Sequence, residues 1–325
     1  MKEIRYIGAI NEALKEEMER DEDVVLIGED VGIPGGAFGA SRGLYDRFGP
    51  ERVFDTPISE AGIMGLAAGA AACGLRPIVE IMFMDFMTTC MDGIVNQIAK
   101  MRYMFGSQYT VPIVIRTPAG AGLNAGPQHS QSLEAWFAHV PGLKIVMPGT
   151  PYDVKGLLKS AIRDDNPVIV VENKTLHGLK GSIPEEEYLV PIGKADIKKE
   201  GSDVTVVATS RMVHEALKAA DILGQEKINI EVIDLLSISP WDKETVLSSV
   251  AKTHRLVIAH EAVKSFGVGA EISAVVAEEI MEELDAGIMR VGAPFVPIPF
   301  SLEKAYLPNA DDVIKAIKKT LDRTF

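Results

Sequence analysis

The chain has 325 residues, of which 47% are hydrophobic, and carries 33 basic against 46 acidic side chains for a formal net charge of −13. A chain of this length and apolar content can bury two cores, so two domains are expected. Its acidity repels phosphate backbones and no basic patch stands out, which argues against a nucleic-acid partner. The apolar uncharged run at residues 61–75 is too short to span a bilayer, so no membrane partner is expected.

The two cysteines, Cys73 and Cys90, lie in apolar surroundings and form no CxxC or Cys/His metal pattern. Such cysteines are typical of core thiols in a reducing compartment. The sequence therefore favours a cytoplasmic protein.

Helix and strand patterns alternate along the first half of the chain. Ile7, Ile10, Leu14 and Met18 have the spacing of one apolar helix face. Short apolar runs without polar alternation predict strands of a buried parallel sheet. They lie at 24–27, 53–54, 77–83, 111–115, 144–147 and 168–171. The alternation predicts an α/β architecture.

The uncharged run 61–75 predicts a buried helix. Gly62, Gly65 and Gly69 would leave one side of it nearly flat. A flat side lets a second helix approach closely, and that helix could belong to another subunit.

Glycine, proline and charge interrupt the pattern at 181–201, which we interpret as a linker between domains 1–180 and 202–325. A second α/β series follows it. Strands are predicted at 204–208, 230–235 and 256–259, and helices at 212–223, 243–250, 269–284 and 313–321.

Four side chains follow predicted strands, where the ligands of parallel sheets collect. They are Glu29, Glu60 behind the potential N-cap Ser59, Phe86, and His129 at the end of a glycine-rich loop. Each also has an ordinary structural interpretation, as a loop acid, a first-turn acid, a core aromatic and a hydrogen-bonded loop residue. Together they would suit a flat heterocycle that needs stacking and proton transfer.

A dinucleotide site is the main alternative, because the segment GAGLNA at 120–125 fits the relaxed GxGxxG/A pattern after a strand. Gly126 and Pro127 follow where a helix would have to begin, and no suitable ribose-binding acid lies about 20 residues on. The fingerprint therefore fails. The sequence also lacks the GxxxxGK[ST] and HExxH motifs.

Several motifs together closely resemble the beta subunits of the thiamine-diphosphate-dependent decarboxylating component of 2-oxo acid dehydrogenase complexes. They are GEDVG at 28–32, DTPISEAGI at 55–63, QHSQS at 128–132, HVPGLK at 139–144, SAIRDDNP at 160–167 and HEA at 260–262. The resemblance covers nearly the whole chain. It implies two parallel-sheet α/β domains, a transketolase-like pyrimidine-binding domain followed by a transketolase C-terminal domain.

The resemblance also assigns roles to the candidate residues. Glu60 matches the glutamate that hydrogen-bonds the pyrimidine ring of thiamine diphosphate, and Phe86 the aromatic that stacks on that ring. Glu29 matches a second acid near the ring, and Ile58 lies in the same wall. His129 matches a histidine that faces the substrate and the incoming lipoyl group, where it would serve as a general acid.

The Gly-Asp-Gly element with which this superfamily holds magnesium and diphosphate is absent from the sequence. The resemblance therefore implies half an active site, completed by an alpha subunit that holds magnesium, in an alpha2beta2 heterotetramer active only when both subunits are present.

Two further sites follow from the resemblance alone. Residues that match a potassium site of some relatives are Ile113, Ala161, Ile162, Asp164 and Asn166. Asp285 and the C-terminal Phe325 match the region where relatives dock the lipoyl acyltransferase core. The ordinary interpretations are a turn that ends a helix in the first case, and a surface acid with a frayed tail in the second.

The expected function is a subunit of a thiamine-dependent acetoin or 2-oxo acid dehydrogenase that passes the cleaved acyl unit to a lipoyl group. The stretches at 126–136 and 148–153 most resemble acetoin dehydrogenases, with pyruvate dehydrogenases next. The alternatives are a different split transketolase-like enzyme and a non-catalytic scaffold subunit. The presence of Glu60, Phe86 and His129 argues against the scaffold.

Overall fold

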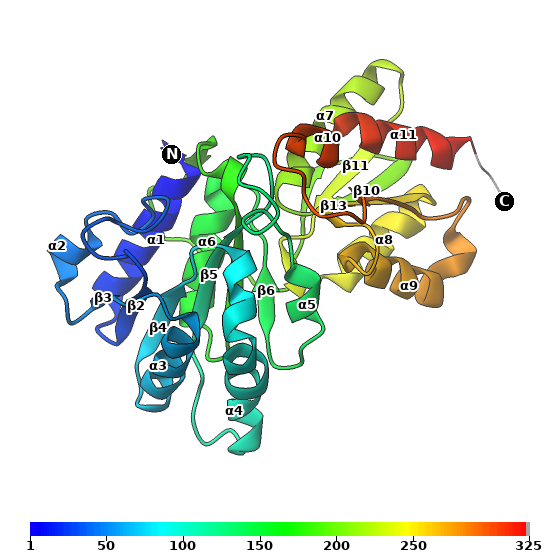
Figure 1. The fold of residues 1–325 in the computed structure, drawn as a ribbon. Helices are drawn as coiled ribbons and strands as arrows, with labels where there is room; N and C mark the ends of the chain where they lie inside the picture. Colours follow the sequence, from blue (N-terminus) through cyan, green and yellow to red (C-terminus); the bar gives the residue numbers. More distant parts are fainter. Residues whose placement is uncertain (323–325) are drawn as a thin grey trace. The chain divides into compact units, whose positions relative to one another are not determined.

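The computed structural model describes residues 1–322 and divides into two compact units (Figure 1). The N-terminal unit comprises Met1–Ala119 and Trp136–Ile192. The C-terminal unit comprises Gly120–Ala135 and the chain from Gly193 onward. The short segment 120–135 therefore belongs to the C-terminal unit, although it lies within the first half of the sequence.

The N-terminal unit is built on a parallel sheet with strands in the order β6-β7-β5-β4-β2-β3. A separate antiparallel pair joins β1 to β8. The strands of this unit are β1 (Lys2–Arg5), β2 (Val24–Gly28), β3 (Val53–Asp55), β4 (Arg76–Glu80), β5 (Val114–Ala119), β6 (Lys144–Val146), β7 (Val168–Asn173) and β8 (Lys180–Ile183).

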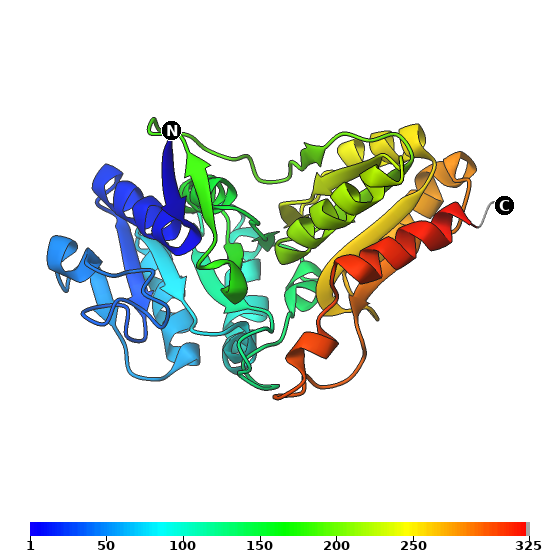
Figure 2. The same ribbon diagram turned by 90° about the horizontal axis from the view of Figure 1, so that it is seen from above.

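Helices cover both faces of this sheet. They are α1 (Tyr6–Arg20), α2 (Leu44–Phe48), α3 (Glu60–Ala72), α4 (Ala99–Met104), α5 (Glu134–Ala138) and α6 (Pro151–Arg163), with the irregular helices η1 (Met84–Cys90), η2 (Gly93–Ile98) and η3 (Lys174–Leu176). Figure 2 shows α1 and α6 side by side on one face and α3 on the other. Both faces of β2 are therefore covered, which explains why its run has no polar alternation.

The sheet of the C-terminal unit has the order β14-β13-β10-β11-β9, parallel except for β9. Its strands are β9 (Asp196–Lys199), β10 (Val204–Ala208), β11 (Ile230–Asp234), β13 (Leu256–Val263) and β14 (Met289–Ala293), and the short β12 (Ser237–Ser239) also belongs to this unit. Its helices are α7 (Arg211–Gln225), α8 (Lys243–Thr253), α9 (Val268–Ile280), η4 (Met281–Glu283), α10 (Glu303–Tyr306) and α11 (Ala310–Leu321). Helices α7 and α11 cover one face of this sheet, and α8 and α9 the other (Figures 1 and 2).

The predicted α/β fold class is confirmed, and most differences lie at the ends of elements. The strand predicted at 111–115 is β5, which begins at Val114 because Pro112 cannot donate a ladder hydrogen bond. That strand continues through Arg116, whose charge is neutralised within the core. The strand predicted at 77–83 ends at Glu80.

The segment 181–201, predicted as a linker, contains most of β8 and all of β9. β8 pairs with β1, and β9 pairs with β11 at a sheet edge. Both strands are short and partly charged, so they give no apolar run that sequence reasoning could detect. Apart from the segment 120–135, the chain passes from the N-terminal to the C-terminal unit between Ile192 and Gly193.

Candidate active site

Three adjacent strand ends of the N-terminal unit bring four of the predicted residues to one edge of the sheet. Glu29 directly follows β2, and Phe86 lies in η1 after β4. Ile58 and Glu60 follow β3, with Glu60 as the first residue of α3. Because β4, β2 and β3 are neighbours in the sheet, these side chains gather where ligands of parallel sheets bind.

The GEDVG motif is fixed by a contact to the next strand. The backbone N–H of Gly32 donates to Asp55 Oδ1 over 2.7 Å, which ties the end of the Glu29 loop to the end of β3. A Cβ on Gly32 would collide with that same carboxylate, so a larger residue would displace Asp55 and disturb this hydrogen bond. The motif thus holds the Glu29 loop beside the segment that carries Glu60.

Two carboxylates interact at this edge. Burial raises the pKa of Glu29 above its usual value, and the negative charge of Glu60 raises it further, against a backbone hydrogen bond from Ser59 that lowers it. The Oε1 atom of Glu29 is buried and has no hydrogen-bond partner within residues 1–322. An orphaned buried carboxyl oxygen is costly unless a ligand supplies a donor.

The apolar part of the site comes from Phe86 and Ile58. Phe86 packs edge-on against Phe83 at a centroid distance of 5.4 Å, and the Ile58 side chain is 85% exposed. Ser59 occupies the N-cap position of α3, but its side chain makes no capping bond. The predicted N-cap position is thus confirmed without the side-chain bond, and the backbone carbonyl of Ser59 accepts the first intrahelical hydrogen bond, from Ile63.

His129 lies in the C-terminal unit, on the loop that follows β5. Its backbone N–H donates to the carbonyl of Gly126 over 3.3 Å. No helix begins between Gly120 and Leu133, which agrees with the failed dinucleotide fingerprint. The predicted site residues are thus divided, with four in the N-terminal unit and His129 in the other.

Sequence reasoning missed a buried charge cluster near the same strand ends. Arg116 on β5 lies 2.7 Å from Glu80 on β4 and 2.7 Å from Glu172 on β7, and His177 Nε2 is 3.4 Å from Glu172. These acids and this arginine each end or interrupt an apolar strand run. A charge inside such a run is the signal that could have revealed the cluster.

Glu134, at the start of α5, was also missed. Burial raises its pKa to about 7, and the nearby Glu261 carboxylate adds to the rise, while a hydrogen bond to its own backbone opposes it. Its Oε2 atom has no hydrogen-bond partner in the described chain.

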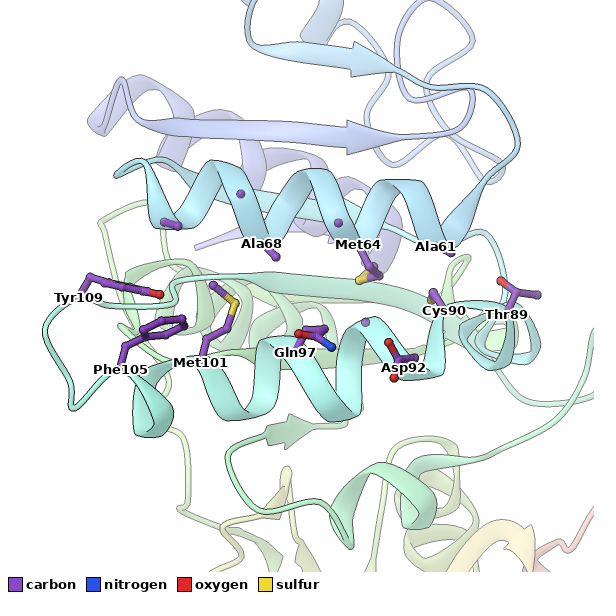
Figure 3. Close-up of a pocket in the computed structure, with 14 residues that line it drawn as sticks. Ala61, Met64, Ala68, Thr89, Cys90, Asp92, Gln97, Met101, Phe105 and Tyr109 are labelled. Carbon is purple, nitrogen blue, oxygen red and sulfur yellow. The ribbon is translucent and has the colours of Figure 1, made fainter.

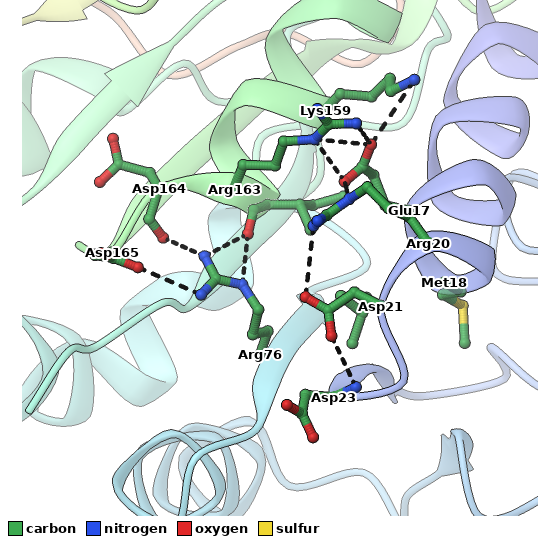
Figure 4. Close-up of polar contacts among 12 residues, drawn as sticks. Glu17, Met18, Arg20, Asp21, Asp23, Arg76, Lys159, Arg163, Asp164 and Asp165 are labelled. Carbon is green, nitrogen blue, oxygen red and sulfur yellow. Dashed lines mark hydrogen bonds and ion pairs between the residues drawn. The ribbon is translucent and has the colours of Figure 1, made fainter. Parts of the chain in front are cut away.

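Four of the residues expected at a potassium site lie in the last turn of α6 or just after it, namely Ala161, Ile162, Asp164 and Asn166. Figure 4 shows Asp164 beside the Arg76 side chain. The Arg76 guanidinium donates to the carbonyls of Ile162 and Asp164 over 2.8 to 3.0 Å. The carbonyls of Ala161 and Ile113 accept from Asp164 N and Val168 N. The carbonyl oxygens of four of the five residues therefore already accept hydrogen bonds, and that of Ile162 accepts two.

The acid predicted to dock an acyltransferase core is half exposed. Asp285 Oδ2 lies 3.1 Å from Arg255 Nη1. Phe325, predicted to act with it, lies outside the described residues.

Helix α3 corresponds to the buried helix predicted at 61–75, but in the isolated chain only one of its sides is buried. The prediction of full burial is therefore wrong for the single chain. Ile63, Met64 and Ala67 face the core, while Gly62, Gly65 and Gly69 are exposed. An apolar groove of about 600 Å³ runs between α3 and the segment η2–α4, lined by Gly65 and Gly69 among others (Figure 3).

Within residues 1–322, no group of three or more His, Cys, Asp or Glu side chains is arranged to hold a metal ion. None of the helices in that range is both long and apolar enough to cross a membrane.

Comparisons with known proteins agree with this arrangement. Residues 2–179 match the family "Transketolase, pyrimidine binding domain", and residues 193–313 match "Transketolase, C-terminal domain". The acetoin:2,6-dichlorophenolindophenol oxidoreductase subunit beta of Cupriavidus necator is 49% identical, over 96% of each chain. The mitochondrial pyruvate dehydrogenase E1 component subunit beta-2 of Oryza sativa is 48% identical, over 99% of this chain and 87% of the rice protein.

Among solved structures, a split-gene transketolase described as an inactive beta4 tetramer has a TM-score of 0.81 at 26% identity, and the match covers 99% of each chain. The order of the two matched families along the chain is the order of the two units.

Proposed function

This chain belongs to the transketolase-like family of beta subunits of thiamine-diphosphate-dependent acetoin and 2-oxo acid dehydrogenases, and on that premise we propose that it supplies the pyrimidine-binding half of a shared active site. The observation that carries the proposal is the pair Glu29 and Glu60, two interacting carboxylates at adjacent strand ends, one with a buried oxygen that lacks a partner among the described residues.

The residues fit the cofactor by their chemistry. Thiamine diphosphate, when bound, supplies the carbanion chemistry of the reaction. An aminopyrimidine ring has N–H donors for a buried carboxyl oxygen such as Glu29 Oε1 and a ring nitrogen for the Glu60 carboxyl. Phe86 offers an aromatic face, and Ile58 an apolar wall. Glu60 would hold the proton that the ring nitrogen exchanges.

The second half of the site requires another chain. The Gly-Asp-Gly element for magnesium and diphosphate is absent from the sequence. We therefore assign both to an alpha subunit in an alpha2beta2 assembly. The exposed glycines of α3 and the apolar groove beside them support an interface with another subunit, because small residues allow helices to approach closely.

The experiment is a cofactor titration of the purified chain, with and without a candidate alpha subunit that carries the missing element. The chain alone should neither bind thiamine diphosphate and magnesium tightly nor turn over, and the mixture should do both. Robust turnover by the chain alone would refute the half-site proposal.

Acetoin is the proposed substrate, with pyruvate as the competing one. The support is the 49% identity to two subunits named for acetoin, against 48% and less for those named for pyruvate. Reduction of 2,6-dichlorophenolindophenol by the assembled enzyme, with each substrate in turn, decides between them.

His129 is proposed to act after cleavage, as the general acid that protonates a lipoyl sulfur when the cleaved unit is transferred. The lipoyl group belongs to an acyltransferase core, for which Asp285 is the proposed contact. Replacement of Asp285 by Asn should weaken binding of that core and leave reduction of an artificial oxidant unchanged.

A potassium ion at the carbonyls of Ile113, Ala161, Ile162, Asp164 and Asn166 completes the proposal. A carbonyl oxygen has two lone pairs, so an ion could use the second one of Asp164, whose carbonyl accepts from Arg76, whereas the Ile162 carbonyl accepts two bonds from that guanidinium. Thermal unfolding in potassium chloride against choline chloride at equal ionic strength tests the site. An equal melting temperature in the two salts would exclude potassium.

A further inference from the structure

The glycine-rich loop that carries His129 wraps around one buried carboxylate, that of Glu303. The backbone N–H groups of Gly122 and Asn124 donate to Glu303 Oε2 over 2.6 and 2.8 Å. The N–H of Gly126 and the hydroxyl of Ser130 donate to Oε1, each over 3.3 Å. Four donors of the loop thus converge on one side chain that is 1% exposed.

The backbone conformation of the loop makes this convergence possible. Gly122, Asn124 and Gly126 all have positive φ, of 112°, 54° and 80°. Such conformations turn successive N–H groups toward one point and create an anion-binding concavity. The positive φ angles of Gly122 and Gly126 let the loop fold around the Glu303 carboxylate. This role explains the glycine-rich sequence that resembles a dinucleotide-binding motif.

Glu303 is held as an anion. Burial by itself would raise its pKa, but the bonds from Gly122, Asn124, Gly126 and Ser130 outweigh burial and lower the pKa below its usual value. Residues 120–133 form neither helix nor strand, so no regular backbone ladder fixes the loop, and the N–H groups of Gly122, Asn124 and Gly126 bond to the Glu303 carboxylate instead.

A second carboxylate holds the start of the same loop. The N–H of Ala121 donates to Glu261 Oε1 over 2.8 Å, and Arg211 Nε donates to Glu261 Oε2 over 2.7 Å. Arg211 also donates to the carbonyl of Pro308 over 2.8 Å, five residues after Glu303. The Ala121 side chain packs with Tyr306 in a small apolar cluster. Glu303 is therefore itself held in place by its surroundings.

We infer that Glu303 is a positioning residue, whose carboxylate fixes the conformation of the loop and so places His129 for the transfer to the lipoyl group. This inference rests on the proposed function of His129. It assigns no contact between Glu303 and the substrate, because the four hydrogen bonds that its carboxylate makes within residues 1–322 all go to the loop.

The test replaces Glu303 by Gln in the chain assembled with its alpha subunit. An amide nitrogen cannot accept hydrogen bonds, so one pair of loop donors loses its acceptor. Hydrogen exchange of the Gly122, Asn124 and Gly126 amides should accelerate about tenfold or more, while β10 and β11 exchange as before. The lipoyl-dependent rate should fall by about tenfold to 100-fold, because a reacting group displaced by about 1 Å loses that much. The rate with an artificial oxidant should fall much less.

Two variants provide the controls. Lys304→Gln changes the exposed neighbour of Glu303 and should alter neither measurement. Glu231→Gln removes a fully buried carboxylate of the same unit, one that accepts from Ser249 and Gly201 and makes no bond to the loop. It should lower the melting temperature without a selective loss of the lipoyl-dependent rate.

Unchanged exchange of the loop amides in Glu303→Gln would overturn the inference. The inference would also be overturned if Glu303→Gln lowered the lipoyl-dependent rate and the artificial-oxidant rate equally, as Glu231→Gln is expected to do when the two variants have similar melting temperatures. A wild-type assembly without lipoyl-dependent activity would refute the proposed function instead, and the exchange experiment would still decide whether Glu303 orders the loop.

Discussion

Arg116 and Glu172 form an ion pair in the interior of the N-terminal unit, with 2.7 Å between Nη2 and Oε1 and neither side chain more than 1% exposed. Glu80 lies on the other side of the same guanidinium. One cation thus faces two carboxylates. Burial raises the pKa of Glu80, and Arg116 does not fully offset it, whereas Arg116 and His177 together lower the pKa of Glu172 despite its burial.

Replacement of Arg116 by Met should therefore destabilise the protein severely. Two carboxyl groups would remain buried without their cation, and loss of one partner of a buried pair costs about 3–5 kcal/mol. Urea unfolding measures the free energy, with Arg5→Met on the exposed strand β1 as the control. A loss below about 1 kcal/mol would mean that solvent reaches the cluster.

Glu134 predicts a pH dependence of stability. Its pKa of about 7 in the folded chain lies above the value of 4.5 expected when unfolded, so the folded state retains a proton that the unfolded state releases between these values. Stability should fall as the pH rises through that window, by up to about 3 kcal/mol. Thermal unfolding from pH 4.5 to 8 measures this effect.

Glu134→Gln should abolish the fall and make the protein more stable than wild type at pH 8, with no gain at pH 4.5. The exposed Glu278→Gln is the matched control and should follow the wild-type profile. Parallel profiles for wild type and Glu134→Gln would show that the carboxyl is ionised throughout.

Glu60→Gln should leave assembly with the alpha subunit intact and lower the cleavage rate by about 100-fold to 10,000-fold, because an amide cannot exchange a proton with the pyrimidine ring. Single-turnover kinetics measures the rate. Glu51→Gln, which changes an exposed acid of the same unit, is the control. A loss of less than about tenfold would return Glu60 to the role of a first-turn helix acid.

His129→Ala separates transfer from cleavage. The lipoyl-dependent reaction should lose far more than the reaction with an artificial oxidant, because only the first needs a proton at the sulfur. If both rates fall equally, His129 acts in cofactor or substrate activation. If neither falls, it is a loop histidine without a role in the chemistry.

Much of this arrangement could be predicted from the sequence. The apolar run of β2 and the periodicity of α1 are local patterns, and both elements lie where they were expected. Glu29 and Glu60 could be placed at the same sheet edge because parallel strands end on the same side. Local patterns also explain the errors. The predicted strand 111–115 stops before Arg116 because a charge normally ends a buried apolar run. The neighbouring sequence does not show that Glu80 and Glu172 neutralise this charge.

The anchor of the His129 loop could not be predicted in this way. Gly122 and Glu303 are 181 residues apart, and Glu303 begins a helix of four residues with no apolar periodicity. The sequence around Gly122 instead imitates a dinucleotide motif. Nothing near Glu303 indicates that four donors from the first half of the chain converge on it.

The assignment of 120–135 to the C-terminal unit has a consequence for engineering and for recombination between related genes. A crossover at Ile192 and Gly193 would take the loop with His129 from one parent and its anchor Glu303 from the other. If the loops of the two parent proteins differ in conformation, the chimera should still fold, but Glu303 of one parent would not hold the loop of the other and His129 would be misplaced. Exchanging 120–135 together with the second half would keep the loop and its carboxylate as one inherited module.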